Sequence, residues 1–317
     1  MNWQGILDYS ITLGVLSATL ALFSIGLNLQ WGLAGLVNFG HVAFMTVGAY
    51  ITVLLSLQGV PWWIAWLLGA VGAGLLGLGI GWTAIRLKQD YLGIVTVGVA
   101  ELLRLLVKNE KPLGWLTRGD LGIQTFPRPF WDVNMPSPMG GTVSADWYPW
   151  LLLLLLTITI GIIFVLTAIM NRSPWGRVLK AIREDEEVAT ALGKNVFSYK
   201  LQAFVLGGFV AGLAGAFYVW SLKTIYPDFF KPEVSFQAWM IVSIGGAGNN
   251  LGVILGAFIF QLYNSLPRFL PEVIKQQLGG GRIEAVQVML TGITLVLVML
   301  WRPQGILGKK SELTLTR

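Results

Sequence analysis

Few residues in this chain are of the types that carry out chemistry in proteins. Its 317 residues include one histidine, His41, and no cysteine. These counts exclude disulfides, zinc–thiolate sites, cysteine nucleophiles and metal sites that need several histidines. A lone histidine among glycines is more often a packed, hydrogen-bonded residue than a proton relay. We therefore expect no catalytic centre, no metal site and no cofactor.

Two charged residues are notable for their spacing. Glu101 and Arg104 lie three residues apart within an otherwise apolar stretch, 91–108. Residues at this spacing share one face of a helix and can pair. Charged groups inside a membrane are costly and usually face the bundle interior or a cavity. We interpret them as a structural intramembrane ion pair, with a site for a zwitterionic substrate as the alternative.

The composition is that of an integral membrane protein. Hydrophobic residues make up 55% of the chain and charged residues 12%, whereas a typical soluble domain carries about 25% charged residues. From residue 1 to residue 85 the only formal charge is Asp8, and the first basic residue is Arg86. The net charge of +6 is explained by basic residues gathered on one membrane face, so no nucleic acid partner is needed.

Apolar runs predict an all-α polytopic fold that forms a single transmembrane domain over 1–317. A spanning helix needs about 20 mainly apolar residues. About nine transmembrane or half-spanning helices are expected, at 6–29, 32–58, 61–85, 91–108, 148–170, 198–220, 235–247, 251–266 and 283–301. The seventh is too short to span alone and ends in the glycine-rich run 245–250, which predicts a broken helix or a re-entrant hairpin.

The distribution of basic residues predicts the orientation. Lys and Arg are frequent in loop 171–200 and in the tail after residue 301, and such segments face the cytoplasm. Counting helices from these points places the amino terminus outside and the carboxyl terminus in the cytoplasm. The segment 109–147 then lies outside, where we expect it to form a small cap.

A faint internal repeat points to a translocation path. Gly32-Leu33-Ala34-Gly35 resembles Gly245-Gly246-Ala247-Gly248, and paired glycine-interrupted segments in two halves of a chain are typical of transporters. An equally good explanation is that membrane proteins are simply rich in glycine, and small residues also serve close helix packing. The candidate residues for the path or the helix breaks are Gly32, Gly35, Asn38, Gly40, His41, Gly245, Gly246 and Gly248.

The loop 171–197 predicts two short amphipathic helices on the cytoplasmic face. Ser173 can cap the first helix, Pro174 suits its first position, and Gly193 can end the second. The acidic turn 184–187 separates them. One interpretation is a loop lying on membrane lipid, but the acidic residues disfavour contact with a negatively charged leaflet. The other is docking of a helix into a groove of a partner protein.

This loop resembles the coupling loop of LivM-type permeases, which are membrane subunits of ATP-binding-cassette importers for branched-chain and neutral amino acids. The resemblance extends through 32–50, 91–104, 245–252 and 302–307, although Asn38 stands where relatives often carry serine. The resemblance implies ATPase-coupling roles for Pro174, Gly176, Arg177, Ile182, Arg183, Glu184, Glu187, Ala189 and Gly193.

The resemblance also implies partners and a location. It implies a LivH-like second permease subunit, two cytoplasmic ATP-binding subunits and an external solute-binding protein, in a bacterial inner membrane. The chain itself has no phosphate-binding loop of the Gly-x-x-x-x-Gly-Lys-Ser/Thr type, so it is expected not to be an enzyme. The alternatives are a urea importer of the same kind, a stand-alone secondary transporter and, with little raw material, an intramembrane enzyme.

Overall fold

The computed structural model describes residues 3–109, 117–130, 135–136, 142–143, 147–265, 280–301 and 304–308. This part of the chain is mainly helical. The long helices, in chain order, are α1 (Trp3–Leu27), α2 (Val42–Leu57), α3 (Trp62–Ala84), α4 (Gln89–Lys108), α6 (Tyr148–Arg172), α9 (Val196–Leu222), α10 (Glu233–Gly245), α11 (Asn250–Ser265) and α13 (Gly280–Trp301). Each long segment predicted from the sequence therefore contains one helix.

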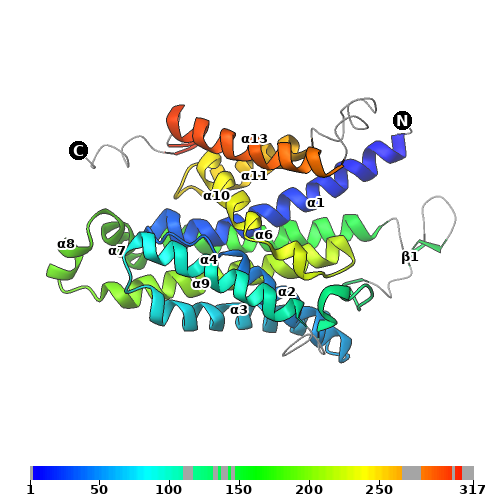
Figure 1. Cartoon of the computed structure of the whole chain (residues 1–317), viewed down its shortest axis with the longest axis horizontal. Coiled ribbons are helices and arrows are strands. Elements are labelled where there is room, and N and C mark those ends of the chain that lie inside the picture. The colour runs from blue at the N-terminus through cyan, green and yellow to red at the C-terminus, as the bar shows by residue number, and fades with distance from the viewer. Residues whose placement is uncertain are drawn as a thin grey trace.

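Most of the long helices run along the long axis of the molecule, which has two distinct ends (Figure 1). At one end lie the short helices α7 (Pro174–Glu184) and α8 (Glu186–Ala191), together with the last turn of α13. The start of α1 lies at the other end, as do the two-residue strands β1 (Met135–Pro136) and β2 (Thr142–Val143), which pair antiparallel. We call these the α7 end and the β1 end.

Helix α9 forms the centre of the bundle and packs against α1, α2 and α3. Close approach is possible because small residues face one another. A side chain at Gly48 of α2 would overlap the backbone of Gly212 in α9. Such contacts bring helix backbones together in membranes, where packing replaces the hydrophobic effect as the main attraction between helices.

The outer surface of the bundle is apolar. Leu75 on α3 is 62% exposed and Leu154 on α6 is 58% exposed. Within the described ranges, four helical stretches are long and apolar enough to cross a bilayer: 9–33, 62–84, 148–172 and 196–222. Exposed faces of this size mark contact with lipid or with another membrane protein.

The predicted broken helix is present. Helices α10 and α11 are bent by 118° at a short interruption, as expected from the glycine-rich run 245–250. The predicted helix over 32–58 was wrong at its start. The chain continues α1 through the π-helical turn η1 (Asn28–Leu33), then loses regular structure before α2 begins at Val42.

The described parts of the predicted external cap lie at the β1 end. The 3-10 turn η3 (Gly119–Leu121) is followed by Ile123, which pairs its backbone with Ile225 at 3.0 Å in both directions. Ile225 precedes η4 (Pro227–Phe230), which leads into α10. Residues 110–116, 131–134, 137–141 and 144–146 of the cap lie outside the described residues.

Candidate functional site

The loop between α6 and α9 forms two capped helices, as its sequence predicts. The Ser173 hydroxyl accepts a hydrogen bond from the Gly176 amide at 3.3 Å, and Pro174 opens α7. Asp185 separates α7 from α8 and caps α8 by accepting from the Glu187 amide at 2.9 Å. These caps satisfy amide groups that the first turn of a helix leaves free.

The loop buries one face and exposes the other. Leu179 and Ile182 of α7 and Ala189 of α8 are buried. Val188 is 55% exposed and Leu192 is 73% exposed. Gly193 follows with a φ of 75°, a conformation that favours glycine, and ends the second helix as predicted. The exposed apolar side chains of α8 are therefore presented on a rigid support.

An ion pair fixes α8 to the bundle. The Lys200 ammonium near the start of α9 pairs with the Glu186 carboxylate of α8. Lys200 is only 6% exposed, so α8 is held at a defined position. Sequence reasoning assigned Lys200 only to a basic loop, because its partner lies on a helix whose path the sequence does not show.

A second contact connects the loop to the bundle interior. The Arg183 guanidinium, in the last turn of α7, donates a hydrogen bond to the carbonyl oxygen of Gly32 in η1. The stem of Arg183 also packs over Gly35, whose φ is 68°. Two residues singled out for different reasons, one for coupling and one for a helix break, thus lie in direct contact.

We call residues 34–41, between η1 and α2, the first break. Asn38 organises it: its amide donates to Gln30 Oε1 at 2.7 Å, and its side-chain oxygen accepts from the Gly40 amide at 2.9 Å. Gln30 in turn donates to the Phe204 carbonyl of α9 at 2.8 Å. Asn38 is fully buried, so this side chain supports irregular backbone in the interior.

Neighbouring helices satisfy further backbone groups of the first break. The Phe39 amide donates to Thr96 Oγ1 of α4 at 3.2 Å. The Trp239 indole of α10 donates to the Asn38 carbonyl at 2.8 Å. Non-helical backbone is tolerated at membrane depth only when protein or water meets its polar groups in this way. These long-range partners explain why a break replaces the predicted start of helix 32–58.

His41 lies at the end of the first break and is fully buried. Its Nε2 atom is 3.1 Å from the Phe23 carbonyl of α1. The ring is 4.7 Å from the Phe23 ring and 5.6 Å from the Phe44 ring, measured between centroids. This environment agrees with a packed hydrogen-bonding residue.

We call residues 246–249, between α10 and α11, the second break. Gly246 and Gly248 have φ values of 107° and 84°, which favour glycine. The tail lies against this segment, because the Leu307 amide donates to the Gly245 carbonyl at 3.1 Å. The predicted path residues of the second half are thus placed at the α7 end of the molecule.

Asn28 brings the two halves together. Its side-chain oxygen accepts from the Gly248 amide at 2.8 Å, and its amide donates to Asn250 Oδ1 at 2.8 Å. The side-chain amide of Asn250 in turn donates a hydrogen bond to Thr167 Oγ1 of α6 at 2.6 Å. Sequence reasoning missed both asparagines, although an amide in an apolar helix is a visible signal for a buried polar contact.

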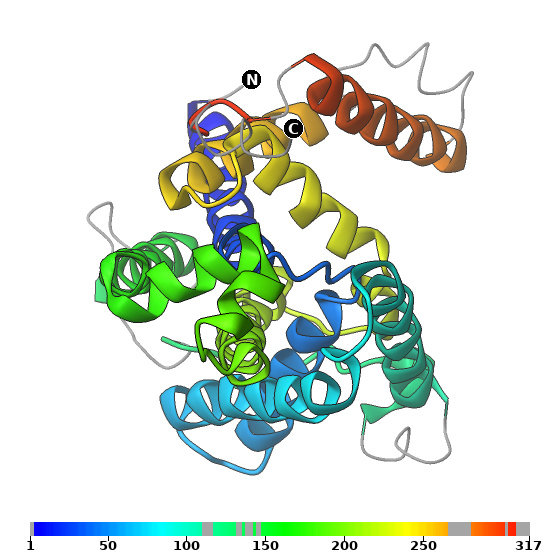
Figure 2. The same cartoon turned by 90° about the vertical axis from the view of Figure 1, so that its left-hand side faces the viewer.

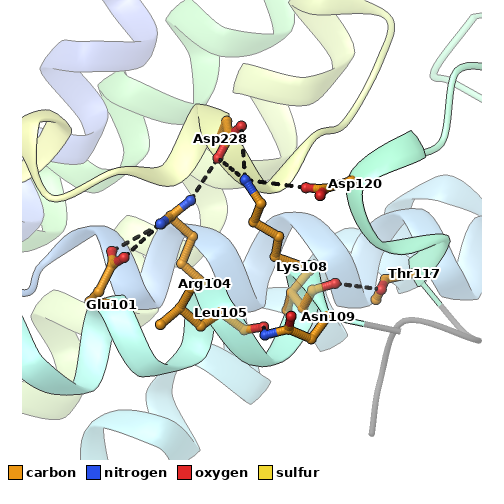
Figure 3. A network of polar contacts seen from close by, with 9 residues as sticks. Glu101, Arg104, Leu105, Lys108, Asn109, Thr117, Asp120 and Asp228 are labelled. Carbon is orange, nitrogen blue, oxygen red and sulfur yellow. Dashed lines mark hydrogen bonds and ion pairs between the residues drawn. The ribbon is translucent and has the colours of Figure 1, made fainter. Parts of the chain in front are cut away.

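The predicted ion pair of α4 belongs to a larger network that includes residues of η3 and η4 (Figure 3). Arg104 binds Glu101 with distances of 2.9 and 2.6 Å and also binds Asp228 of η4 at 2.6 Å. Lys108 lies 3.3 Å from Asp228 and 3.3 Å from Asp120. The network therefore ties α4 to η4 and to the cap.

The structure separates the candidate residues into two groups. The coupling loop and the two breaks lie close together at the α7 end, where Arg183 contacts Gly32. Glu101 and Arg104 belong instead to the network of α4, η3 and η4. No group of three or more His, Asp or Glu side chains in the described ranges could hold a metal ion. Hydrogen bonds through η1 connect the coupling loop with both breaks.

Comparison with known proteins shows the family of the chain. Residues 10–299 match the family described as "Branched-chain amino acid transport system / permease component". The chain belongs to this family, whose members are transport subunits rather than enzymes.

Individual relatives carry the same description. The chain is 30% identical to the high-affinity branched-chain amino acid transport system permease protein LivM of Escherichia coli K12, covering 94% of this chain and 70% of the relative. It is 25% identical to a probable LivM of Methanocaldococcus jannaschii, covering 92% and 91%. It is also 25% identical to LivH of E. coli K12, covering 94% and 93%. No solved structure matches the chain significantly.

Proposed function

We propose that this chain is one of two permease subunits of an ATP-binding-cassette importer for branched-chain or other neutral amino acids. A LivH-like subunit would form the second half, two cytoplasmic ATP-binding subunits would supply energy, and an external binding protein would deliver the substrate. The similarity to both LivM and LivH supports a pair of related permeases. The relatives named above are described by branched-chain amino acids, which favours these substrates over urea.

The proposed orientation places the α7 end in the cytoplasm. The connection between α3 and α4, the loop 171–197 and residues 304–308 all lie at this end, whereas α1 begins at the other. The basic residues of loop 171–200 lie at this end too, as expected of a cytoplasmic segment. The amino terminus is then outside and the carboxyl terminus inside a bacterial inner membrane. The long helices act as nine transmembrane or half-spanning segments of a single domain over 1–317.

The observation that carries the mechanism is the contact between Arg183 and Gly32. Movement of an ATPase against α7 and α8 would pass through this hydrogen bond to η1 and the first break. Asn28 extends the connection to the second break. The two breaks are the proposed moving parts of an alternating-access pathway, because each lacks the continuous hydrogen bonding that stiffens a helix.

The proposal assigns roles to the candidate residues. In the coupling loop, Pro174 and Gly193 delimit the two helices, and Glu184 and Glu187 present acidic groups beside exposed apolar residues. In the path, Gly40 allows the first break to lie against the backbone of α4 at Thr96. The remaining members of each set support these positions: Gly176, Arg177, Ile182 and Ala189 in the loop, and Gly35, Asn38, His41, Gly245 and Gly246 at the breaks.

Purification from the native membrane tests the proposal. An ATP-binding subunit should copurify with the chain. The double variant Glu187→Arg with Leu192→Glu changes the exposed surface of α8 and should reduce the recovered ATPase severalfold. A matched control is Lys194→Gln, since Lys194 is exposed in the same loop and its backbone alone makes the described contact. Full recovery of the ATPase with the α8 double variant would contradict docking at this loop.

A further inference from the structure

A cleft opens at the α7 end between the coupling loop, the second break and the tail. Its volume is about 290 Å³. Its walls come from α6, α7, α11 and residues 304–308. The lining residues are Phe164, Asn171, Arg172, Lys180, Ala247, Gly248, Asn249, Asn250, Leu251, Leu307 and Gly308.

The cleft carries uncompensated positive charge. Arg172 at the end of α6 and Lys180 in the middle of α7 both line it. Neither forms an ion pair with any carboxylate among the described residues, and no Asp or Glu belongs to the described lining. The first residues of α11, Asn250 and Leu251, also line the cleft, and the start of a helix favours an anion. These features together favour an anion in the cleft.

The surroundings of the cleft distinguish a lipid from a soluble anion. Leu251, in the first turn of α11, is 54% exposed and lines the cleft. From it, Leu255 and Leu262 continue an exposed apolar stripe along α11 at helical spacing. A ligand that fits both parts has an anionic head and long apolar chains.

The cleft also lies where a phospholipid headgroup would lie. Asn250 of α11 and Thr167 of α6 are hydrogen bonded at 2.6 Å, so the two helices meet directly beside the cleft. Figure 2 looks onto this end of the molecule, with α6 in green and α11 in gold. Basic pockets between transmembrane helices on the cytoplasmic side are suited to acidic lipid headgroups.

We propose that this cleft binds the headgroup phosphate of an acidic phospholipid, held by Arg172 and Lys180, with its acyl chains on the apolar stripe of α11. A bound lipid would join α7, the second break and the tail. This site is separate from the exposed surface of α8, so lipid and ATPase could bind at the same time. The inference depends on the membrane assignment, but lipid binding does not require transport.

Native mass spectrometry of the purified chain in detergent tests the site. The wild-type protein should retain phosphatidylglycerol in preference to phosphatidylcholine when both are titrated. The double variant Arg172→Gln with Lys180→Gln should bind phosphatidylglycerol about tenfold more weakly or worse, since each cation near a lipid surface contributes substantially. The control Lys88→Gln with Lys194→Gln removes two exposed charges from the same end and should change binding less than about twofold.

Three results would overturn the proposal. Equal binding of phosphatidylglycerol by the Arg172/Lys180 variant and the wild type would remove the site. If the Lys88/Lys194 control weakened phosphatidylglycerol binding equally, the effect would be due to net charge and not to this cleft. Complete displacement of the lipid by millimolar inorganic phosphate would indicate a soluble anion instead. A size-exclusion profile identical to wild type verifies the fold of each variant. Lipid binding is measured separately from transport, so a variant that loses only transport activity does not bear on the lipid site.

Discussion

At the scale of single residues, Arg183 and Arg104 illustrate what a sequence conceals. Each was singled out from its local context, Arg183 in a loop motif and Arg104 beside Glu101. The structure adds a partner far along the chain to both: Gly32 for Arg183 and Asp228 for Arg104. Local spacing predicts pairs on one helix, but it carries no information on partners that only the tertiary fold brings near.

Replacing Arg183 with glutamine should reduce transport without reducing ATPase binding. The shorter neutral side chain loses the charge-assisted hydrogen bond to the Gly32 carbonyl. We expect uptake by the assembled transporter to fall about tenfold, within the usual range of coupling energies, while ATPase copurification stays unchanged. Lys194→Gln is the control. A variant that loses ATPase and uptake together would indicate a docking role instead.

Arg104→Gln should destabilise the protein more than Lys108→Gln. Each side chain contacts two carboxylates, but Arg104 is 13% exposed with contacts of 2.6 Å, whereas Lys108 is 30% exposed with contacts of 3.3 Å. We expect a loss of about 1–2 kcal/mol for Arg104 and a smaller loss for Lys108, measured by thermal unfolding. An exchange of Glu101 and Arg104 should not rescue stability, because it places a carboxylate at position 104 facing Asp228. If the exchange restored stability, Glu101 and Arg104 would act as an isolated pair, without a contribution from Asp228.

At the scale of elements, apolar run lengths and caps predicted most of the architecture. Ser173, Pro174 and Gly193 each have a local conformational reason for their positions, so the two loop helices were predictable. The first break was misplaced because the apolar pattern continues through it. Its irregular backbone depends on Thr96 and Trp239, and partners 57 and 201 residues away leave no periodic signal.

Gly40→Ala should disrupt the first break. A Cβ atom at this position would overlap the Thr96 carbonyl of α4, and overpacking of this kind costs about 1–3 kcal/mol. Gly161→Ala is the matched control, since Gly161 is an exposed helical glycine of α6 with open space around it. Folded yield and melting temperature should fall for Gly40→Ala and stay equal or rise for Gly161→Ala. Tolerance of Gly40→Ala would mean that the first break and α4 lie farther apart.

At the scale of the whole molecule, the two ends account for the uneven distribution of charge. The stretch from residue 1 to residue 85 contains no basic residue, and it includes α1, the first break, α2 and α3. The first basic residue, Arg86, lies at the α7 end beside α8 and α9. Composition alone predicted a membrane protein, but the arrangement of its two ends required the fold.

Thiol labelling should reveal the orientation, because the chain has no native cysteine. A single cysteine at position 194 would lie in the exposed coupling loop, and one at position 121 would replace Leu121, which is 79% exposed at the β1 end. In intact cells a membrane-impermeant maleimide should label Leu121→Cys and not Lys194→Cys. After permeabilisation both should react. The reverse pattern would invert the proposed orientation.

ATP-dependent uptake in proteoliposomes tests the central claim most directly. The chain would be reconstituted with and without its copurifying permease, ATPase and binding protein, and uptake of radiolabelled leucine would be measured. Uptake should require all partners, with ATP supplied on the side of the membrane where the ATPase lies. The chain alone should transport no more leucine than empty vesicles do. Leucine uptake by the purified chain alone, without ATP, would contradict the account.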